Sequence, residues 1–377
     1  KSNGNIVTVF TAKPNYPKGR FFSGYTFFNK STEEYKGIKV YRSPIIPRGN
    51  GNGFNLFLNY ISFVIFGFFK LLLIKDKFDK IFVYAPSPIT VGYLGIAASF
   101  IFRAKPYLWV HDLWPESVKD AGGINNKFLL YLVGLMTKSI YYFYDNILVQ
   151  SPSFKDYLSN QGVSESKIIF YPYYAENFYE VVKENSKIKS QFGKGLKIVF
   201  AGNIGVAQSF DTIFYAVKIL ATKLKDFKFI IIGDGRDRKR IQKKIADNSL
   251  DNYFEFLGSY PPEKMPAFFA SADALLVSLK DTKIFSMTIP GKLQSYLACG
   301  KPIIASLNGI GAKLVEESKS GFTSRAEDPE SLAASVLKFS KLSSAQKKEL
   351  GKNARIYYKK EFERSRLLTR LIDIFAK

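Results

Sequence analysis

The chain has 377 residues with 55 basic and 32 acidic side chains, a formal charge of +23, and it contains one histidine and one cysteine. This length predicts two domains of about 150 residues each, with a sizeable core. The single cysteine excludes a disulfide framework and, together with the single histidine, a His/Cys zinc cluster, so any imidazole chemistry depends on His111.

The chain begins at Lys1, without a methionine or a signal peptide. Residues 2–5 predict a turn, and residues 6–10 predict a buried strand directly after it. A start one turn before a strand is typical of a fragment, so we expect the natural protein to be longer.

Short β-branched and aromatic runs alternate with longer helical stretches along the whole chain. In the first half, the predicted strands are 6–10, 38–41, 81–85, 107–110, 146–150 and 168–171. In the second half they are 197–201, 227–232, 254–257, 274–278 and 302–306. Strand–helix alternation predicts the α/β class, with parallel sheets and helical crossovers. The stretch 171–191 lacks apolar periodicity and separates the two series, which predicts an interdomain linker.

The loop after the first strand carries Tyr16, Lys18 and Arg20. It leaves the carboxyl end of a strand and is too basic to be buried, so it could hold an acceptor or a phosphate. A plain surface turn built from proline and glycine is the alternative interpretation.

Residues 54–74 form an apolar stretch long enough to span a bilayer. Three interpretations remain open. The stretch could be a buried crossover helix, a helix lying in a membrane interface next to the lysines of 70–80, or a spanning helix. We disfavour the spanning helix because the strands 38–41 and 81–85 on either side are expected to belong to one sheet.

His111 directly follows the strand 107–110, and open α/β sheets bind ligands at the carboxyl ends of their strands. An imidazole there can donate to a sugar hydroxyl or carry a proton, or it can simply cap the local backbone. Asp112 and Glu116 lie in the same turn and favour a functional site, so these three residues are the catalytic candidates.

Two glycine-containing loops follow strands in the second half. Such loops expose backbone N–H groups, and a helix N-terminus behind them favours an anion, although a plain tight turn is the alternative. The candidates are Gly202, Asn203, Gly205, Gln208, Gly233, Asp234 and Gly235. The basic run 236–244 after the second loop predicts one solvated helix face.

The stretch around the next predicted helix is the strongest candidate. Thr288 is expected as its N-cap, Pro290 as its first residue and Gly300 as its end. Free N–H groups together with Lys292 predict a diphosphate site, with an ordinary capped helix as the alternative. Cys299 is interpreted as a core residue. The candidates here are Ser286, Met287, Thr288, Ile289, Pro290, Lys292 and Gln294.

Several motifs, taken together, have a familiar order. They are PNYPKG, HDLWPES, GNIGVAQ, IIGDG, FLGSYPPEKMPAFFASADALLVSL and PGKLQSYLACGKPIIAS. With them the chain resembles family 4 of the retaining glycosyltransferases, and within it the subgroup that builds bacterial O-antigen and capsule, such as N-acetylfucosamine transferases.

The resemblance implies the GT-B fold, in which two Rossmann-like domains with parallel sheets face a central cleft. Residues 1–172 would form the acceptor domain, without the first strand and helix of family members. Residues 173–190 would be the linker and 191–353 the donor domain. A helix in 354–377 would cross back to the first domain.

The resemblance also implies roles for residues. His111 would contact the donor sugar, Gly202, Asn203 and Gln208 would form a phosphate loop, and the loop 233–235 would lie near the nucleoside. Asn203 and Gln208 replace the basic residues of many members, so the phosphate charge is expected from Lys292.

A second departure from the family concerns two glutamates. Ser286 and Gln294 replace them, and the second glutamate normally binds the ribose. Gln294 keeps hydrogen-bonding capacity but lacks the charge, which leaves the identity of the donor open.

We therefore expect retaining transfer of an N-acetylated aminosugar from a UDP-linked donor to a polyprenyl-diphosphate-linked saccharide. No metal cofactor is expected, since the sequence has no Asp-x-Asp motif, and no nucleic-acid partner. The enzyme is expected in the cytoplasm, peripheral on the inner face of the bacterial membrane. The alternatives are a sugar-nucleotide epimerase, or a basic non-enzymatic protein that binds membrane or nucleic acid.

Overall fold

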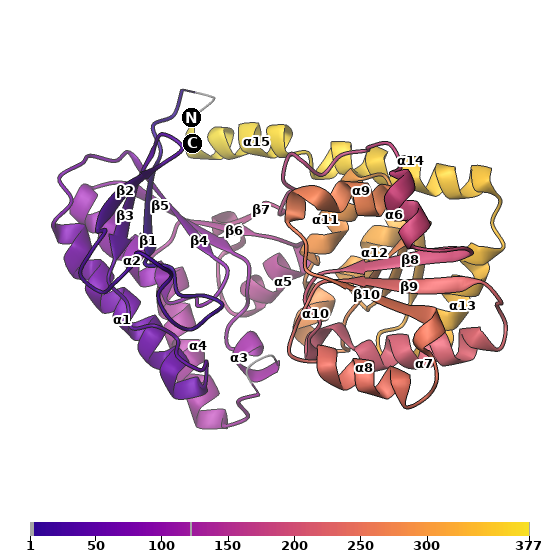
Figure 1. Cartoon of the computed structure of the whole chain (residues 1–377). Helices are drawn as coiled ribbons and strands as arrows, with labels where there is room; N and C mark the ends of the chain where they lie inside the picture. Colours follow the sequence, from indigo (N-terminus) through magenta and orange to yellow (C-terminus); the bar gives the residue numbers. More distant parts are fainter. Residues whose placement is uncertain (1–3, 121–122, 377) are drawn as a thin grey trace. The chain divides into compact units, whose positions relative to one another are not determined.

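The computed structural model describes residues 4–120 and 123–376, so part of the turn predicted at 2–5 lies outside the described residues. The chain forms two compact units (Figure 1). The first comprises the chain up to residue 119 together with 124–149 and 157–169. The second comprises mainly 150–156 and the chain from residue 170 onward.

The strands of the first unit form two sheets. A three-stranded sheet has the order β1 (Thr8–Ala12), β3 (Ile38–Ser43), β2 (Thr32–Tyr35), with β1 parallel and β2 antiparallel to β3. A four-stranded sheet has the order β4 (Lys80–Ala85), β5 (Lys105–Val110), β6 (Asn146–Val149), β7 (Ile168–Phe170).

Three strand predictions for the first unit need correction. The first strand starts at Thr8 rather than at residue 6. The strand β2 was not predicted, because its sequence TEEY is polar and carries no apolar alternation. The strands β3 and β4, which we expected in one sheet, lie in different sheets.

The helices before residue 170 lie between these strands. They are α1 (Gly53–Leu72), α2 (Val91–Phe102), α3 (Glu116–Asp120), α4 (Lys127–Tyr142), α5 (Pro152–Asn160) and the short 3-10 turn η1 (Glu165–Lys167).

The long apolar helix α1 packs along one face only. Asn52 caps it by accepting a hydrogen bond from the backbone N–H of Asn55 at 2.9 Å. On the inner face, Gly67 allows close contact with α2, since a Cβ there would lie 2.9 Å from Leu94 side-chain carbons. By length and composition α1 could cross a membrane, but only 22% of its most apolar window is buried. The helix is therefore neither fully buried nor free of the protein.

The second unit is built on a six-stranded parallel sheet. Its order is β10 (Phe254–Gly258), β9 (Phe227–Ile232), β8 (Leu196–Ala201), β11 (Ala274–Ser278), β12 (Ile303–Ser306), β13 (Gly321–Ser324). The first five in chain order were predicted. The strand β13 was missed, because its sequence GFTS is short and contains little apolar signal.

Helices cover both faces of this sheet (Figure 1). One core cluster involves α7 (Phe210–Ala221), α8 (Arg238–Ala246) and α13 (Pro329–Ser340). The other involves α9 (Met265–Ala270), α11 (Gly291–Ala298), α12 (Ile310–Glu317) and α14 (Ser344–Glu361). The remaining elements are α6 (Ser186–Gln191), η2 (Val206–Gln208), η3 (Asp251–Tyr253), η4 (Pro262–Lys264), α10 (Lys283–Met287) and α15 (Arg364–Ala376).

One predicted helix is divided in the structure. The stretch 354–375 was expected to be continuous, but α14 ends at Glu361 and α15 begins at Arg364. Phe362 lies at the break and is buried in the core of the second unit. The buried ring therefore holds the segment between the two helices against the core of the second unit.

Candidate active site

The strand order of the second unit fixes where a ligand would bind. In a doubly wound sheet, ligands bind at the carboxyl ends of strands where the order of the chain reverses. That point here lies between β8 and β11, which are neighbours in the sheet. The predicted loop after β8 therefore starts at the switch point.

Two glycines at adjacent strand ends pack against each other. Gly202 has φ +134° and Gly233 has φ +140°, a backbone region that residues with a Cβ rarely adopt. A Cβ on Gly233 would lie 1.9 Å from the carbonyl oxygen of Gly202. The Gly202 N–H donates to the carbonyl of Ile232 at 2.8 Å. These glycines are thus required for the contact between the two loops.

Further hydrogen bonds join the same two loops. The Ile204 N–H donates to the carbonyl of Asp234 at 2.9 Å, and the Ile204 carbonyl accepts from the Asp237 N–H at 3.1 Å. Gln208 closes the first loop, since its Oε1 accepts from the Gly205 N–H at 3.2 Å and from Asn203 Nδ2 at 3.4 Å. The structure thereby brings the predicted residues of 202–208 and 233–235 together.

Lys292 packs against the first of these loops. A Cβ on Gly202 would lie 2.7 Å from Lys292 Cε, and Lys292 Nζ lies 3.6 Å from the centroid of the Phe200 ring. Within the described residues, no hydrogen bond or ion pair holds this ammonium. Burial lowers the pKa of Lys292 to about 7. An unpaired, desolvated ammonium beside a strand-end loop at a helix N-terminus is well placed to bind an anion.

The start of this helix differs from the prediction. Thr288 is not the N-cap; it closes α10, and its Oγ1 donates to the carbonyl of Ile284 at 2.8 Å. Pro290 is the capping residue and helix α11 begins at Gly291. The reason is the extended backbone of Pro290, with ψ 131°, which delays the first helical turn.

The neighbours of Pro290 point in different directions. Ser286 Oγ donates to the carbonyl of Lys283 at 2.8 Å, the Met287 carbonyl accepts from Ser151 Oγ at 2.6 Å, and Ile289 is buried. In this stretch only Lys292 presents an unpaired charged group to the switch point.

Gln294 lies fully buried within helix α11. With the side-chain amide oriented so that its oxygen and its nitrogen both have suitable partners, Nε2 donates to the carbonyls of Pro290 at 2.8 Å and Gly291 at 3.1 Å. A neutral amide suits this position, since a buried carboxylate would be desolvated and could not donate. The predicted contact of Gln294 with a ribose remains a prediction.

Two residues near α11 and β11 complete this description. Cys299 is buried, and burial raises the pKa of its thiol to about 12, so its interpretation as a core residue is confirmed. Ser278, at the carboxyl end of β11, was not predicted. Its Oγ is buried and has no hydrogen-bond partner in the part of the chain that the structure describes. The position at a strand end was the sequence signal that could have identified it.

In the first unit, His111 follows β5 and is packed among aromatic rings. Its backbone N–H donates to the carbonyl of Ala85 at 3.1 Å, and its ring centroid lies 4.2 Å from that of Trp109 and 4.7 Å from that of Tyr84. Burial lowers the pKa of His111 to about 3. The imidazole is therefore neutral near pH 7 and suits hydrogen bonding to a sugar better than action as a cationic acid.

The two carboxylates of the same turn accept hydrogen bonds from neighbouring hydroxyls. Ser117 Oγ donates to Asp112, and the Tyr157 hydroxyl donates to Glu116. Burial raises the pKa of Asp112, while hydrogen bonds such as that from Ser117 oppose this shift. Both carboxylates therefore have hydroxyl partners within the first unit, and their predicted catalytic role remains a prediction.

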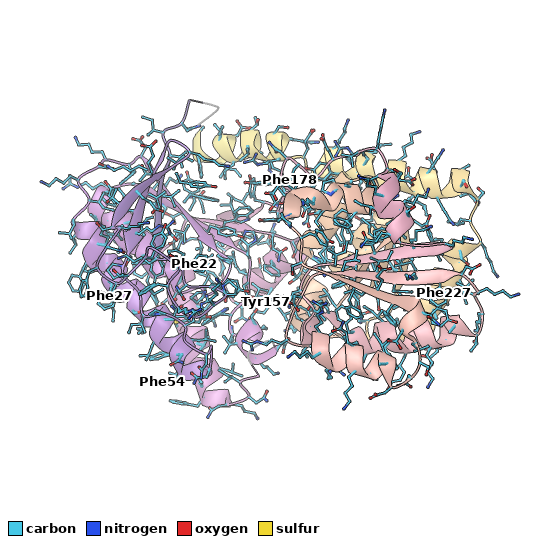
Figure 2. The ribbon with its side chains drawn as sticks, viewed as in Figure 1. Phe22, Phe27, Phe54, Tyr157, Phe178 and Phe227 are labelled. Carbon is cyan, nitrogen blue, oxygen red and sulfur yellow. The ribbon has the colours of Figure 1, made fainter. Side chains whose placement is uncertain are left out.

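The predicted acceptor loop is exposed and firmly attached at its base. Tyr16, Lys18 and Arg20 all have exposed side chains. Gly19, with φ +70°, donates its N–H to the carbonyl of Asn15 and accepts from the Gly49 N–H, each at 2.8 Å. Figure 2 labels Phe22 at the end of this loop.

This attachment brings the loop next to Arg48, a residue that the sequence analysis missed. The Arg48 guanidinium carbon lies 5.1 Å from the Tyr16 ring centroid. Because β1 and β3 are parallel, the loops after them emerge at the same edge of the sheet. Pairing of the predicted strands 6–10 and 38–41 was therefore the signal that could have identified Arg48 in the sequence.

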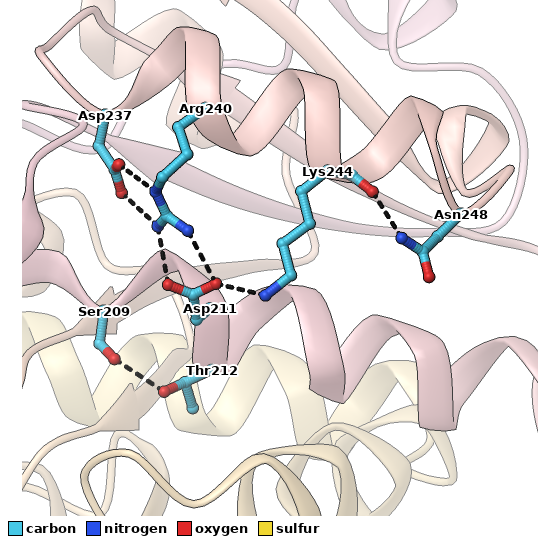
Figure 3. A network of polar contacts seen from close by, with 7 residues as sticks. All are labelled: Ser209, Asp211, Thr212, Asp237, Arg240, Lys244 and Asn248. Atoms are coloured by element: carbon cyan, nitrogen blue, oxygen red, sulfur yellow. Dashed lines mark hydrogen bonds and ion pairs between the residues drawn. The ribbon is translucent and has the colours of Figure 1, made fainter.

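The basic run on α8 is partly neutralised (Figure 3). Arg240 forms ion pairs with Asp237 at 2.5 Å and Asp211 at 2.7 Å, and Lys244 pairs with Asp211 at 2.5 Å. Hydrogen bonding from Arg240 lowers the pKa of Asp211 to about 2. The predicted face is thus solvated at Arg240, which is 50% exposed, but Arg240 and Lys244 also join α8 to α7 through Asp211.

A hollow of about 380 Å³ lies elsewhere in the second unit. Its lining includes Glu180, Glu184 and Glu263, and none of the predicted site residues. Three glutamates against the single lysine of the lining, Lys183, do not suit an anionic nucleotide, so we place no donor there.

Comparisons with known proteins agree with this geometry. Residues 195–341 match the sequence profile of the family described as Glycosyl transferases group 1. The chain is 26% identical over 381 residues to the uncharacterized glycosyltransferase MJ1069 of Methanocaldococcus jannaschii, covering 98% of this chain and 90% of that protein. It is 26% identical over 313 residues to the putative colanic acid biosynthesis glycosyl transferase WcaI of Escherichia coli K12, covering 79% and 74%.

A solved structure extends the likeness to the fold. Anabaena HepE, crystallised in complex with UDP and glucose, matches with a TM-score of 0.67 at 16% identity, covering 90% of this chain and 87% of that one. At this identity the likeness concerns the fold alone. The predicted α/β architecture of GT-B type, with two Rossmann-like units, is confirmed.

Proposed function

We propose that the chain is a group 1 glycosyltransferase of the retaining type, and that it transfers a sugar from a UDP-linked donor to a lipid-linked saccharide in surface polysaccharide synthesis. The prediction of a glycosyltransferase is confirmed by these relatives. The nucleotide, the sugar and the acceptor belong to the proposal. HepE, a protein of the same fold, was crystallised with UDP and glucose, and WcaI is named for colanic acid synthesis.

One observation supports the donor site above all others. Lys292 is an ammonium without a counter-charge in the described residues, and it lies beside Gly202 at the switch point of the second unit. A diphosphate would supply the missing negative charge. The predicted donor contacts of Asn203, Gln208 and the loop 233–235 rest on the same placement.

The chemistry assigned to these groups is retaining transfer. The bond between the anomeric carbon and the diphosphate oxygen breaks, and its electron pair goes to the diphosphate. The acceptor hydroxyl forms the new bond from the same face, and its proton passes to the departing diphosphate. Lys292 and the backbone N–H groups of α11 would stabilise the growing negative charge. His111, which is neutral, would orient the donor sugar through a hydrogen bond.

An N-acetylated aminosugar is our choice of donor sugar, on the strength of the family subgroup that the motifs resemble. Neutral Asn203 and Gln208 in the phosphate loop are part of that pattern. The first test is calorimetric titration with UDP, UDP-glucose, UDP-N-acetylglucosamine and the GDP counterparts. Saturable binding of the UDP set supports the proposal, whereas binding of neither set contradicts it.

The first unit supports association with a membrane surface. Helices α1 and α4 both expose apolar side chains: Phe54, Phe57, Ile61, Ile65, Phe68, Phe128, Tyr131, Leu132, Leu135 and Tyr142. Phe54, at the start of α1 (Figure 2), is 68% exposed. Lysines 70, 75, 77 and 80 near the end of α1 would add attraction to anionic lipid. We propose that this surface lies on the inner face of the cytoplasmic membrane.

Flotation with vesicles containing phosphatidylglycerol tests this surface. The double variant Phe57→Ser/Ile61→Ser removes two exposed side chains of α1 and should lose most vesicle binding. The matched control is Ile356→Ser, an exposed apolar residue of α14 in the second unit, which should bind as the wild type does. Equal binding of all three proteins would contradict the proposal.

The two alternative functions predict other outcomes. A non-enzymatic basic scaffold would bind nucleic acid or vesicles with a steep salt dependence and would ignore UDP-sugars. A sugar-nucleotide epimerase would convert the UDP-sugar without any acceptor, which product analysis would reveal.

A further inference from the structure

The first unit contains a second cation in a prepared environment, which is Arg48. Its guanidinium carbon lies 5.1 Å from the ring centroid of Tyr16 and 5.7 Å from that of Tyr60. Trp114 continues the row, with its ring centroid 6.2 Å from that of Tyr60. The guanidinium is thus flanked by aromatic rings from a loop and from helix α1, an arrangement that cation–π attraction stabilises.

The orientation of Arg48 is fixed from two sides. Its backbone N–H donates to Asn15 Oδ1 at 3.2 Å, and its Nε donates to Asn59 Oδ1 at 3.3 Å. Asn59 is buried and is itself held, because its Nδ2 donates to the carbonyl of Ile46 at 2.6 Å. The planar group is therefore positioned before any ligand arrives.

The outer edge of this guanidinium is unused. Across residues 4–120 and 123–376, neither of its two terminal nitrogens has a hydrogen-bond or ion-pair partner. The nearby loop adds exposed Lys18 and Arg20 rather than an acid. Asp112 acts on Tyr60 electrostatically, but it accepts its own hydrogen bond from Ser117. A planar fork with free donors matches a tetrahedral oxyanion.

We propose that Arg48 binds the phosphate of the acceptor, namely the diphosphate that joins the saccharide to its prenyl chain. Tyr60 lies on α1, whose exposed apolar side chains begin at Phe54, so the phosphate site adjoins the surface on which a prenyl chain could lie. The rings of Tyr16 and Trp114 would pack against the sugar or the first prenyl unit. This inference rests on the proposed lipid-linked acceptor.

The test uses the full chain and farnesyl diphosphate as the probe, in calorimetric titration. The variant Arg48→Gln removes the charge and should weaken binding about 10- to 100-fold, the loss expected for a charge-assisted hydrogen-bonded pair. Arg48→Lys keeps the charge but offers a single ammonium, so an intermediate loss is expected. Arg103→Gln, which removes an exposed charge at the end of α2, is the matched control and should change binding less than twofold.

Two further ligands separate the possible sources of binding. Farnesol lacks the phosphate, and its binding should be weak and insensitive to Arg48→Gln. Octyl glucuronide carries a carboxylate on a sugar; tighter binding of this ligand than of farnesyl diphosphate would overturn the assignment to phosphate. Unchanged affinity of Arg48→Gln for farnesyl diphosphate would overturn it as well.

Titration of the same variants with UDP-glucose keeps this inference distinct from the proposed function. Because the donor site lies in the second unit, Arg48→Gln should bind UDP-glucose as the wild type does, which also shows that the variant is folded. Loss of farnesyl diphosphate binding alone supports the inference. Failure of every protein to bind any UDP-sugar would contradict the donor proposal while leaving the Arg48 result readable.

Discussion

The substitution Lys292→Met tests the central assignment, because it removes one charge and keeps most of the side-chain volume. An ammonium that binds a diphosphate contributes about 1.5–3 kcal/mol. We therefore expect UDP-glucose to bind Lys292→Met roughly 10- to 150-fold more weakly at pH 6. Lys301→Met is the matched control, since Lys301 lies beyond the other end of α11 and burial lowers its pKa too.

The pH dependence gives an independent magnitude. With a pKa of about 7, Lys292 is mostly charged at pH 6 and about one-tenth charged at pH 8. UDP-glucose does not titrate in this range, because its diphosphate is a diester. The wild type should therefore bind about tenfold more weakly at pH 8 than at pH 6. Lys292→Met should show no such change.

The lowered pKa of Lys292 makes stability rise with pH, whereas it makes donor binding weaken with pH. The folded state holds Lys292 with a lower pKa than the unfolded chain, so it binds fewer protons, and stability rises with pH between about 7 and 10.5. Below pH 7 the free wild type carries the full cost of the buried charge. Lys292→Met should raise the free energy of unfolding there by about 1–3 kcal/mol. Wild-type affinity of this variant for UDP-glucose, or pH-independent binding by the wild type, would refute the reasoning.

Three other predictions follow from individual contacts. Gly233→Ala should lower the free energy of unfolding of the second unit by at least about 2 kcal/mol in urea titration, because its Cβ would meet the Gly202 carbonyl. Gly291→Ala is the control and should not destabilise the protein, because a Cβ at Gly291 would meet open space. Asp211→Asn should destabilise by about 1 kcal/mol or less above pH 4, and its stability should converge with that of the wild type as acid titrates the carboxylate towards pH 2 in chemical denaturation. His111→Ala should reduce turnover. In the wild type, the ring-proton NMR signal of this single histidine should not move between pH 5 and 8, since its pKa is about 3. A titration midpoint near pH 6.5 would contradict the buried, neutral imidazole.

The sequence predicted most of the second unit because its strands are apolar over their full length. β8, β9 and β11 are buried on both faces, so periodicity and length identified them directly. The strands β2 and β13 are short and only weakly apolar, so the same two criteria did not identify them. The sheet partners of β3 and β4 were beyond prediction, since pairing depends on contacts between segments that local pattern does not encode.

The candidate site likewise combines residues that the sequence identified with features that only the structure revealed. Residue types and spacing alone identified His111, the loops 202–208 and 233–235, and Lys292, because glycines, a lone histidine and a helix start have recognisable local signatures. Only the tertiary structure revealed that Lys292 has no counter-charge in the described residues, and that Gln294 faces its own helix. Only the tertiary structure brought Arg48 between Tyr16 and Tyr60. Charge, burial and partnership depend on what distant segments place around a side chain, and a linear pattern carries no record of that.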